Sequence, residues 1–286
     1  MSTSDTQGKL ALYAAAGADL LHYEADPRTG RLDRRDVLHS PFPFLKFGWP
    51  DPTMSYLYVA STNAPLGTDG DSHFLSAYRI DKQSGALAPH GDPVALPSGA
   101  THLTLDVPGR HAIAVHRRGI ISVNRINADG TVGEAVPQPP GLDVGIFSHQ
   151  VRVAPSNDLV IVTARGNRPT PNKAEEPGSL NILSYRDGVL GKKSKIAPGL
   201  GFGPRNIGFH PTRSWIYVGL ELQNRIHCYE FRNGEISPKP LFVKDTLAGG
   251  GTSRRDQAGA RGAHHRCTRD ALVAATDAGP AITSDR

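Results

Sequence analysis

The sequence predicts an all-β fold, a β-propeller of four-stranded antiparallel blades. One pattern occurs four times: a short apolar strand, a turn that contains a proline, and a second strand that ends in valine. The four copies occupy residues 44–59, 102–115, 150–162 and 206–218. Their turn prolines are Pro52, Pro108, Pro155 and Pro211, spaced 56, 47 and 56 residues apart. A repeat of about fifty residues filled with strands is typical of a radial array of four-stranded sheets.

A second hairpin follows each copy and completes the blade. These hairpins occupy residues 77–91, 122–136, 181–193 and 228–240. Each one turns at a glycine, and the four glycines are Gly85, Gly130, Gly188 and Gly234. Glycine is expected there because tight hairpin turns need a positive φ. Each blade is therefore expected to run from an inner strand through second and third strands to an outer strand.

The two ends of the chain depart from this pattern. Residues 10–17, 20–26 and 31–38 read as three strands of a blade whose inner strand is expected from the C-terminus, as in closed propellers. The repeat ends near Leu247, and residues 248–286 contain no aromatic residue. We expect an incomplete propeller over 1–247, with about five of seven blades represented, since seven blades need about 350 residues. A low-complexity, disordered tail is expected over 248–286. It reads either as a truncation or frame shift, or as an ordinary tail on a smaller propeller.

Composition argues against several classes of protein. The net charge of +5 is spread among acidic residues, so no basic face predicts nucleic-acid binding. Two cysteines, Cys228 and Cys267, are too few for a disulfide framework or a CxxC metal site. The N-terminus lacks the pattern of a signal peptide, and the apolar stretch 10–21 is broken by Asp19. We expect a cytoplasmic protein without a membrane or nucleic-acid partner, and the oligomeric state stays open.

Ionisable residues recur at two registers of the repeat. The start of each inner strand, six residues before the turn proline, holds Lys46, His102, His149 and Arg205. The loop ten residues after the proline holds Thr62, Arg118, Arg165 and Glu221. If both registers open on one face, the channel mouth combines a general base or acid with a cationic clamp for an anionic substrate.

The segment from about Leu10 to Leu247 resembles the seven-bladed propeller lactonases, which include cycloisomerase-type 6-phosphogluconolactonases and carboxymuconate lactonizing enzymes. Residues 148–155, 203–211 and 219–231 carry the resemblance. It implies a site that needs neither cofactor nor metal. It also implies catalytic roles for His149, Arg205 and Glu221. A further arginine from a later blade of the family has no counterpart here.

These observations favour a lactone hydrolase for an anionic sugar-acid lactone such as 6-phosphogluconolactone. His149 or Glu221 would activate water, and Arg205 would bind the substrate anion or the oxyanion. Arg165 is predicted to bind substrate, and His102 and Lys46 to line the channel and contact substrate. The polar stretch 167–178 predicts a solvated loop at a blade edge, near the channel mouth.

Four alternatives remain from the sequence. The same residues suit a lactonizing enzyme or cycloisomerase that acts on a muconate-like diacid. A calcium-dependent propeller lactonase is disfavoured, because the inner strands begin with cationic rather than acidic side chains. A non-catalytic scaffold of the WD type is disfavoured because no Trp-Asp dipeptide marks the blades. The chain can also be an inactive fragment of an enzyme.

Overall fold

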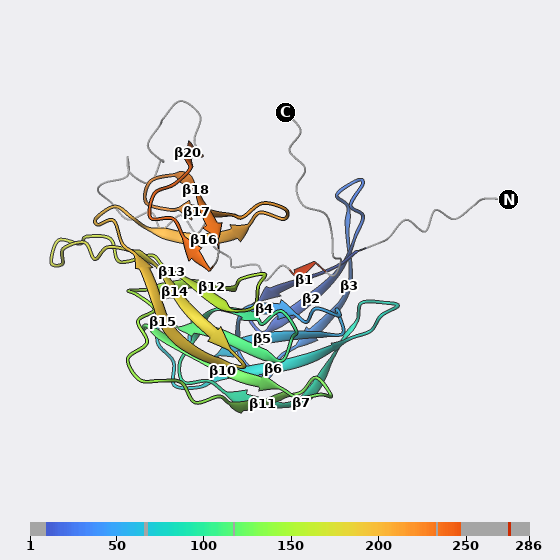
Figure 1. Cartoon of the computed structure of the whole chain (residues 1–286). Coiled ribbons are helices and arrows are strands. Elements are labelled where there is room, and N and C mark those ends of the chain that lie inside the picture. Colours follow the sequence, from blue (N-terminus) through green and yellow to red (C-terminus); the bar gives the residue numbers. More distant parts are fainter. Residues whose placement is uncertain (1–9, 66–67, 117, 233, 247–273, 276–286) are drawn as a thin grey trace. The chain divides into compact units, whose positions relative to one another are not determined.

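The computed structural model describes residues 10–65, 68–116, 118–232, 234–246 and 274–275 (Figure 1). This part of the chain consists of antiparallel strands and turns. It contains no helix, and so no helix that could cross a membrane. The predicted all-β fold is confirmed. The described residues form two compact units: a first unit of those up to 99 with 126–133 and 274–275, and a second unit of 100–125 and 134–246.

The first unit contains two four-stranded sheets, blue to cyan in Figure 1 except for the red strand β21 (Ala274–Ala275). One has the order β21-β1-β2-β3 and is built from β1 (Leu10–Ala16), β2 (Asp19–Ala25), β3 (Leu32–His39) and β21. The other is built in chain order from β4 (Phe44–Pro50), β5 (Tyr56–Thr62), β6 (His73–Ile80) and β7 (Leu87–Ala95). Strand β21 pairs with β1, where the absent inner strand was expected. The rest of the predicted tail lies outside the described residues.

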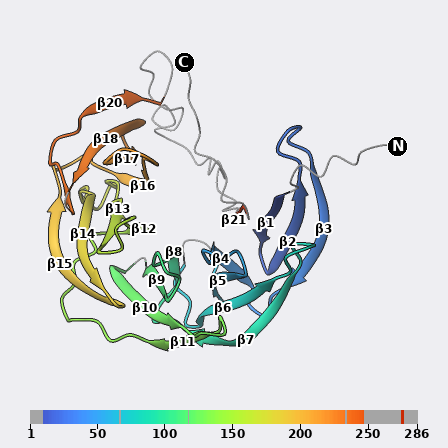
Figure 2. The same ribbon diagram turned by 45° about the vertical axis from the view of Figure 1, so that its right-hand side comes forward.

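Three sheets follow along the chain. The sheet β11-β10-β9-β8 is built from β8 (Ala100–Leu105), β9 (His111–His116), β10 (Ile120–Ile126) and β11 (Val132–Ala135). The next runs in chain order through β12 (Ser148–Val153), β13 (Leu159–Ala164), β14 (Ser179–Arg186) and β15 (Val189–Ile196), as Figure 2 shows. The last contains β16 (Pro204–Phe209), β17 (Trp215–Leu220), β18 (Arg225–Arg232), β19 (Glu235–Ile236) and β20 (Phe242–Asp245).

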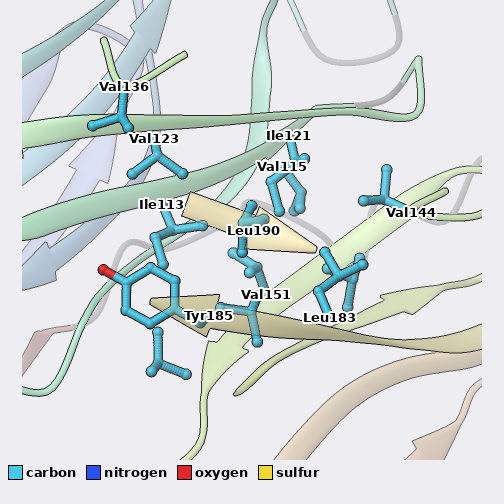
Figure 3. Close-up of a cluster of buried hydrophobic side chains, with 13 residues drawn as sticks. Ile113, Val115, Ile121, Val123, Val136, Val144, Val151, Leu183, Tyr185 and Leu190 are labelled. Carbon is cyan, nitrogen blue, oxygen red and sulfur yellow. The ribbon is translucent and has the colours of Figure 1, made fainter. Parts of the chain in front are cut away.

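The core of the second unit lies between its sheets and consists mainly of valine, isoleucine and leucine. Figure 3 shows one cluster, in which Val115 of β9 and Val151 of β12 are fully buried together with Leu183 of β14. Burial of such a side chain stabilises the fold by about 1.5–3 kcal/mol. Branched side chains of successive sheets thus hold β12, which carries a candidate site residue, against its neighbours.

The four hairpin glycines adopt the backbone conformation predicted from the sequence. Gly85, Gly130, Gly188 and Gly234 have φ values of 74°, 86°, 86° and 74°. At Gly130 the space is restricted as well, because a Cβ atom there would lie 2.3 Å from the Tyr56 ring. A larger residue at Gly130 would therefore be strained by its backbone and by this contact.

Each complete inner strand contains a β-bulge near its start. The pairing skips one residue in β4, β8, β12 and β16, and the skipped residues are Lys46, Thr101, His149 and Arg205. A bulge inserts one residue that has no partner opposite it and re-aims its side chain. Three of the four residues predicted at the strand starts are therefore bulge residues.

The β8–β9 copy of the repeat is shifted by one residue from the alignment on prolines. Ala154 donates the hydrogen bond that closes the β12–β13 turn, and Asp106 donates the corresponding bond in the β8–β9 turn. The residue after Asp106 is Val107, which therefore corresponds to Pro155. Pro108 lies one position later in its turn, so the proline alignment was wrong for this copy.

This shift changes the residues that share a register. Thr101, rather than His102, occupies the bulge position of His149. His102 pairs with Val115 and is buried. In the second register the shift moves the equivalent position from Arg118 to residue 117, which lies outside the described residues.

A buried hydrogen-bond network fixes the β8–β9 turn. The carboxylate of Asp106 accepts hydrogen bonds from the backbone of Arg110 (2.6 Å) and of His111 (2.9 Å). It also accepts one from the His111 ring Nδ1 (3.0 Å) and one from the Tyr185 hydroxyl (2.9 Å). Since Tyr185 lies on β14, the network ties this turn to the neighbouring sheet.

We expect Asp106→Ala to lower the free energy of unfolding by about 2–4 kcal/mol, because the substitution removes the buried carboxylate that accepts hydrogen bonds from Arg110, His111 and Tyr185. Urea denaturation followed by tryptophan fluorescence measures this loss. Asp81→Ala is the matched control, because Asp81 also accepts backbone hydrogen bonds in a hairpin turn, between β6 and β7, but is exposed. Equal losses in the two variants would contradict a stabilising role for the buried network.

Candidate active site

The bulge of β12 presents His149 between two anchored neighbours. Ser148 is fully buried and its hydroxyl donates a hydrogen bond to the Val144 carbonyl (2.8 Å). On the other side, the backbone N–H of Gln150 donates to the Thr163 hydroxyl oxygen (3.0 Å). Both flanking residues are therefore fixed, while His149 itself is excluded from the strand pairing.

The bulge of β16 presents Arg205 and is tied to the first bulge. The Thr163 hydroxyl donates to the Arg205 carbonyl (2.8 Å), and the Gln150 side-chain oxygen accepts from the Ile207 N–H (2.5 Å). Gln150 and Thr163 are both buried. Gln150, which follows His149, and Thr163 thus fix the backbone of β16 at and after Arg205.

Glu221, directly after β17, binds the arginines of the site. Its Oε2 atom accepts a hydrogen bond from Arg205 Nη1 at 2.8 Å and lies 3.7 Å from Arg165 Nη1. The side chains of Arg165, Arg205 and Glu221 are 19%, 29% and 17% exposed, so the ion pairs are largely shielded from water but reachable. The carboxylate therefore fixes two guanidinium groups beside each other.

Arg165 also rests on an aromatic ring. Its guanidinium carbon lies 4.3 Å from the centre of the Phe147 ring, a cation–π contact. Phe147 has a φ of 56°, a left-handed conformation that costs a bulky residue about 1–3 kcal/mol. Hydrogen bonds from Arg165 N to the Phe147 carbonyl (3.0 Å) and from Gly166 N to the Ile146 carbonyl (2.9 Å) hold it there. The strained residue supports a side chain of the candidate site.

Both His149 and Glu221 have lowered pKa values, but the consequences differ for an imidazole and a carboxylate. Burial lowers the pKa of His149 to about 4, and the charges of Arg205 and Arg165 act in the same direction. Burial of Glu221 acts to raise its pKa, but the hydrogen bond from Arg205 and the charges of Arg205, Arg165 and Arg168 outweigh burial and hold the pKa below its usual value. At neutral pH the site therefore contains a neutral imidazole and an ionised carboxylate.

His149 keeps one buried ring nitrogen available. Its Nδ1 atom has no hydrogen-bond partner among the described residues. A buried polar atom of this kind is uncommon in folded proteins and is an unused hydrogen-bonding position for a ligand or water. Neutral imidazole can accept a proton there.

The remaining predicted residues lie in different surroundings. Burial lowers the pKa of His102 well below its usual value, as do the charges of Arg152 and His149, so His102 is near the site but enclosed. Lys46 belongs to the first unit, where its ammonium lies 5.6 Å from the centre of the Phe44 ring. Substrate binding by His102 and by Lys46 stays a prediction.

Four contributors to this site were not predicted from the sequence. Phe147 precedes the strand, and a positive φ at an aromatic residue has no sequence signal. Gln150 and Thr163 appeared only as strand residues of the repeat. Arg168, whose charge acts on Glu221, lies in the polar loop that the sequence placed near the channel mouth. No three His, Cys, Asp or Glu side chains in the described part of the chain gather as a metal site.

A family comparison agrees with the repeat. The family described as lactonase, 7-bladed β-propeller, matches residues 7–265. The chain belongs to this family. The β-sheets and the bulge residues described above thus lie in a propeller lactonase sequence.

This chain has several relatives that are named 6-phosphogluconolactonase. It is 29% identical over 205 residues to a 6-phosphogluconolactonase of Pectobacterium atrosepticum, covering 71% of this chain and 56% of the relative. It is 31% identical over 190 residues to a 6-phosphogluconolactonase of Klebsiella pneumoniae, covering 65% and 51%. The chain therefore spans about half the length of these relatives.

Solved structures show the same fold at low sequence identity. The periplasmic gluconolactonase PpgL of Pseudomonas aeruginosa superposes with a TM-score of 0.67 at 18% identity, over 86% of this chain and 70% of that chain. A protein of Bacteroides fragilis described as a candidate 6-phosphogluconolactonase gives a TM-score of 0.65 at 14% identity, over 85% and 69%. At these identities the likeness concerns the fold alone.

Proposed function

We propose that this propeller lactonase hydrolyses a sugar-acid lactone such as 6-phosphogluconolactone. The observation that carries the proposal is the convergence of the two bulges: a neutral His149 lies in the field of Arg205 and Arg165, and Glu221 holds both arginines. A neutral base beside fixed cations suits attack of water on a carbonyl whose oxygen becomes negative. The names of the relatives support a sugar-acid lactone as substrate.

His149 is the proposed general base. Its pKa of about 4 keeps the ring neutral at physiological pH. Its buried Nδ1 atom has no hydrogen-bond partner among the described residues. Glu221 is less suited, because its Oε2 atom already accepts a hydrogen bond from Arg205 and lies beside the Arg165 guanidinium. We therefore assign Glu221 to the positioning of Arg205 and Arg165.

The proposed reaction proceeds in two steps. Water attacks the lactone carbonyl carbon while His149 accepts one of its protons, and Arg205 stabilises the resulting oxyanion. Collapse of the tetrahedral intermediate then breaks the bond to the ring oxygen, which takes the proton from His149. The product is the open hydroxy acid, and His149 is neutral again. Arg165 contributes hydrogen bonds that bind the substrate.

Product analysis tests the proposal. The purified 286-residue chain is incubated with 6-phosphogluconolactone, and the rate above spontaneous hydrolysis is followed by acid release. Mass spectrometry should show the mass of the lactone plus one water. Activity that appears only with a muconate-like diacid, with conserved mass, would instead identify a cycloisomerase. No turnover of either substrate would favour a scaffold or an inactive fragment, and loss of activity in EDTA would favour a metal-dependent enzyme.

The pH dependence of kcat/KM is expected to report His149. Since the base works only when neutral, kcat/KM should be constant from pH 7 to about pH 5 and should fall once pH drops below the pKa of about 4. The charge of Glu221 raises the His149 pKa in the wild type. In Glu221→Gln this pKa should therefore fall, and the acidic limb should move to lower pH. An inflection near the usual histidine pKa of about 6.5 would contradict the buried neutral base.

The predicted location in the cytoplasm and the absence of nucleic-acid and membrane partners stay predictions. The proposed function itself requires only a small anionic lactone as partner. Fractionation of cells that express the full chain would test the location.

A further inference from the structure

The connection from β13 to β14 contains a small hairpin. Residues 167–176, called the flap below, are paired by bridges between Asn167 and Glu176 and between Thr170 and Lys173. The backbone hydrogen bonds of the first bridge measure 2.9 and 3.0 Å, and the Asn167 amide also donates to the Glu176 carboxylate (2.6 Å). Lys173 Nζ lies 2.7 Å from the same carboxylate. The flap is therefore an ordered element of the described structure.

The flap is fixed to the site at both of its ends. At its start, Gly166 has a φ of 72°, and a Cβ atom there would lie 2.1 Å from the Glu176 carbonyl oxygen, so only glycine fits. Near its end, the Glu175 carboxylate accepts a hydrogen bond from the Gly201 N–H (2.5 Å). Gln223 donates to the Gly201 carbonyl (3.1 Å). Gly201 precedes β16, which begins with the Arg205 bulge, so the flap is attached to the same loop region as the site.

The flap contains Arg168, which is more exposed to solvent than the catalytic candidates. Arg168 follows Arg165 by three residues and is exposed, whereas Arg165 and Glu221 are mostly buried. Its charge is one of those that act on the Glu221 carboxylate. Three guanidinium groups thus share the surroundings of one carboxylate, with Arg168 on the solvent side.

We propose that Arg168 binds the phosphate group of a phosphorylated sugar-acid lactone and so determines the preference for phosphorylated over unphosphorylated substrate. This inference rests on the proposed function. A guanidinium group matches phosphate oxygens through two parallel, charge-assisted hydrogen bonds. A dianion is costly to bury, so the phosphate is best placed at the exposed arginine while the carbonyl reaches the shielded His149 and Arg205.

Three variants of the full chain test the inference. Arg168→Ala should lower kcat/KM for 6-phosphogluconolactone by about tenfold to a hundredfold, as expected for lost hydrogen bonds between charged groups. The same variant should leave kcat/KM for unphosphorylated gluconolactone within about twofold, because that substrate lacks the group concerned. Arg168→Lys should recover part of the loss. Lys173→Ala is the matched control, since it removes one charge from the same flap, where the ammonium contacts Glu176 instead.

Equal losses with both lactones, or equal losses in Arg168→Ala and Lys173→Ala, would overturn the inference and leave lactone hydrolysis intact.

Calorimetric binding of 6-phosphogluconate and gluconate gives a readout that does not depend on turnover. The wild type should bind the phosphorylated acid at least tenfold more tightly, and Arg168→Ala should lose that margin. If the wild type hydrolyses neither lactone but shows this difference, the proposed function fails and the phosphate site stands. If neither protein discriminates, the phosphate site fails.

Discussion

Replacing His149 with alanine is expected to lower kcat for lactone hydrolysis by about a hundredfold to ten-thousandfold, the range for loss of a general base. The backbone of His149 is excluded from the strand pairing. Its ring Nδ1 atom has no hydrogen-bond partner among the described residues. Removing the ring should therefore leave the sheet intact. Steady-state kinetics with 6-phosphogluconolactone, corrected for the spontaneous rate, gives kcat and KM separately.

The comparison with a second histidine makes this result specific. His227→Ala removes a partly buried histidine of β18 whose ring contacts the Tyr229 hydroxyl (3.1 Å). It should keep kcat within about twofold, as is usual away from a reacting centre. Circular dichroism confirms that both variants are folded. If His149→Ala retained wild-type kcat, the general base would have to be another group, and Glu221 would be tested next.

Replacing Arg205 with alanine is expected to lower kcat by about a hundredfold to a thousandfold, the typical effect of removing an oxyanion donor. A second effect follows from the ion pair. Glu221 would lose its 2.8 Å hydrogen bond, and its pKa would rise because burial then acts with less opposition. Arg205→Lys should recover only part of kcat, since an ammonium group lacks the planar geometry of guanidinium.

Arg165→Ala is the natural comparison for Arg205. Its Nη1 atom lies 3.7 Å from Glu221, a longer contact than that of Arg205, and we expect its loss to raise KM more than it lowers kcat. The pair Arg205→Ala and Glu221→Gln should be non-additive, because each change removes the same contact. Unchanged turnover in a His149→Ala, Arg205→Ala double variant would refute the catalytic site and favour a scaffold.

The strand pattern and the turn glycines were predictable because they depend on local rules. Short apolar runs mark the strands, and positive φ at Gly85 and Gly188 follows from hairpin geometry. The register of β8 was not predictable to one residue. Proline suits more than one position of such turns, so Pro108 could not show that Val107 is the equivalent of Pro155.

The candidate site was predictable in part for the same reason. His149, Arg205 and Glu221 occupy repeated positions, and the structure brings Arg205 and Glu221 into contact. The stacking of Arg165 on Phe147 depends on a left-handed backbone that tertiary hydrogen bonds impose. The flap that contains Arg168 is held by the Glu175–Gly201 hydrogen bond, which joins segments 26 residues apart. Contacts of this kind arise between elements and leave no local pattern.

The bulges also bear on how such a protein can change its chemistry over time. Lys46, Thr101, His149 and Arg205 differ in size and charge, yet each is the residue that the strand pairing omits. Because the pairing omits these residues, exchange of their side chains removes no backbone hydrogen bond of the ladder. Selection can thus vary the reactive groups while stability is maintained by other residues. In a propeller of this construction, the residues that can change function are different from those that maintain the fold. The bulge positions are therefore the first places to alter when a new substrate specificity is sought.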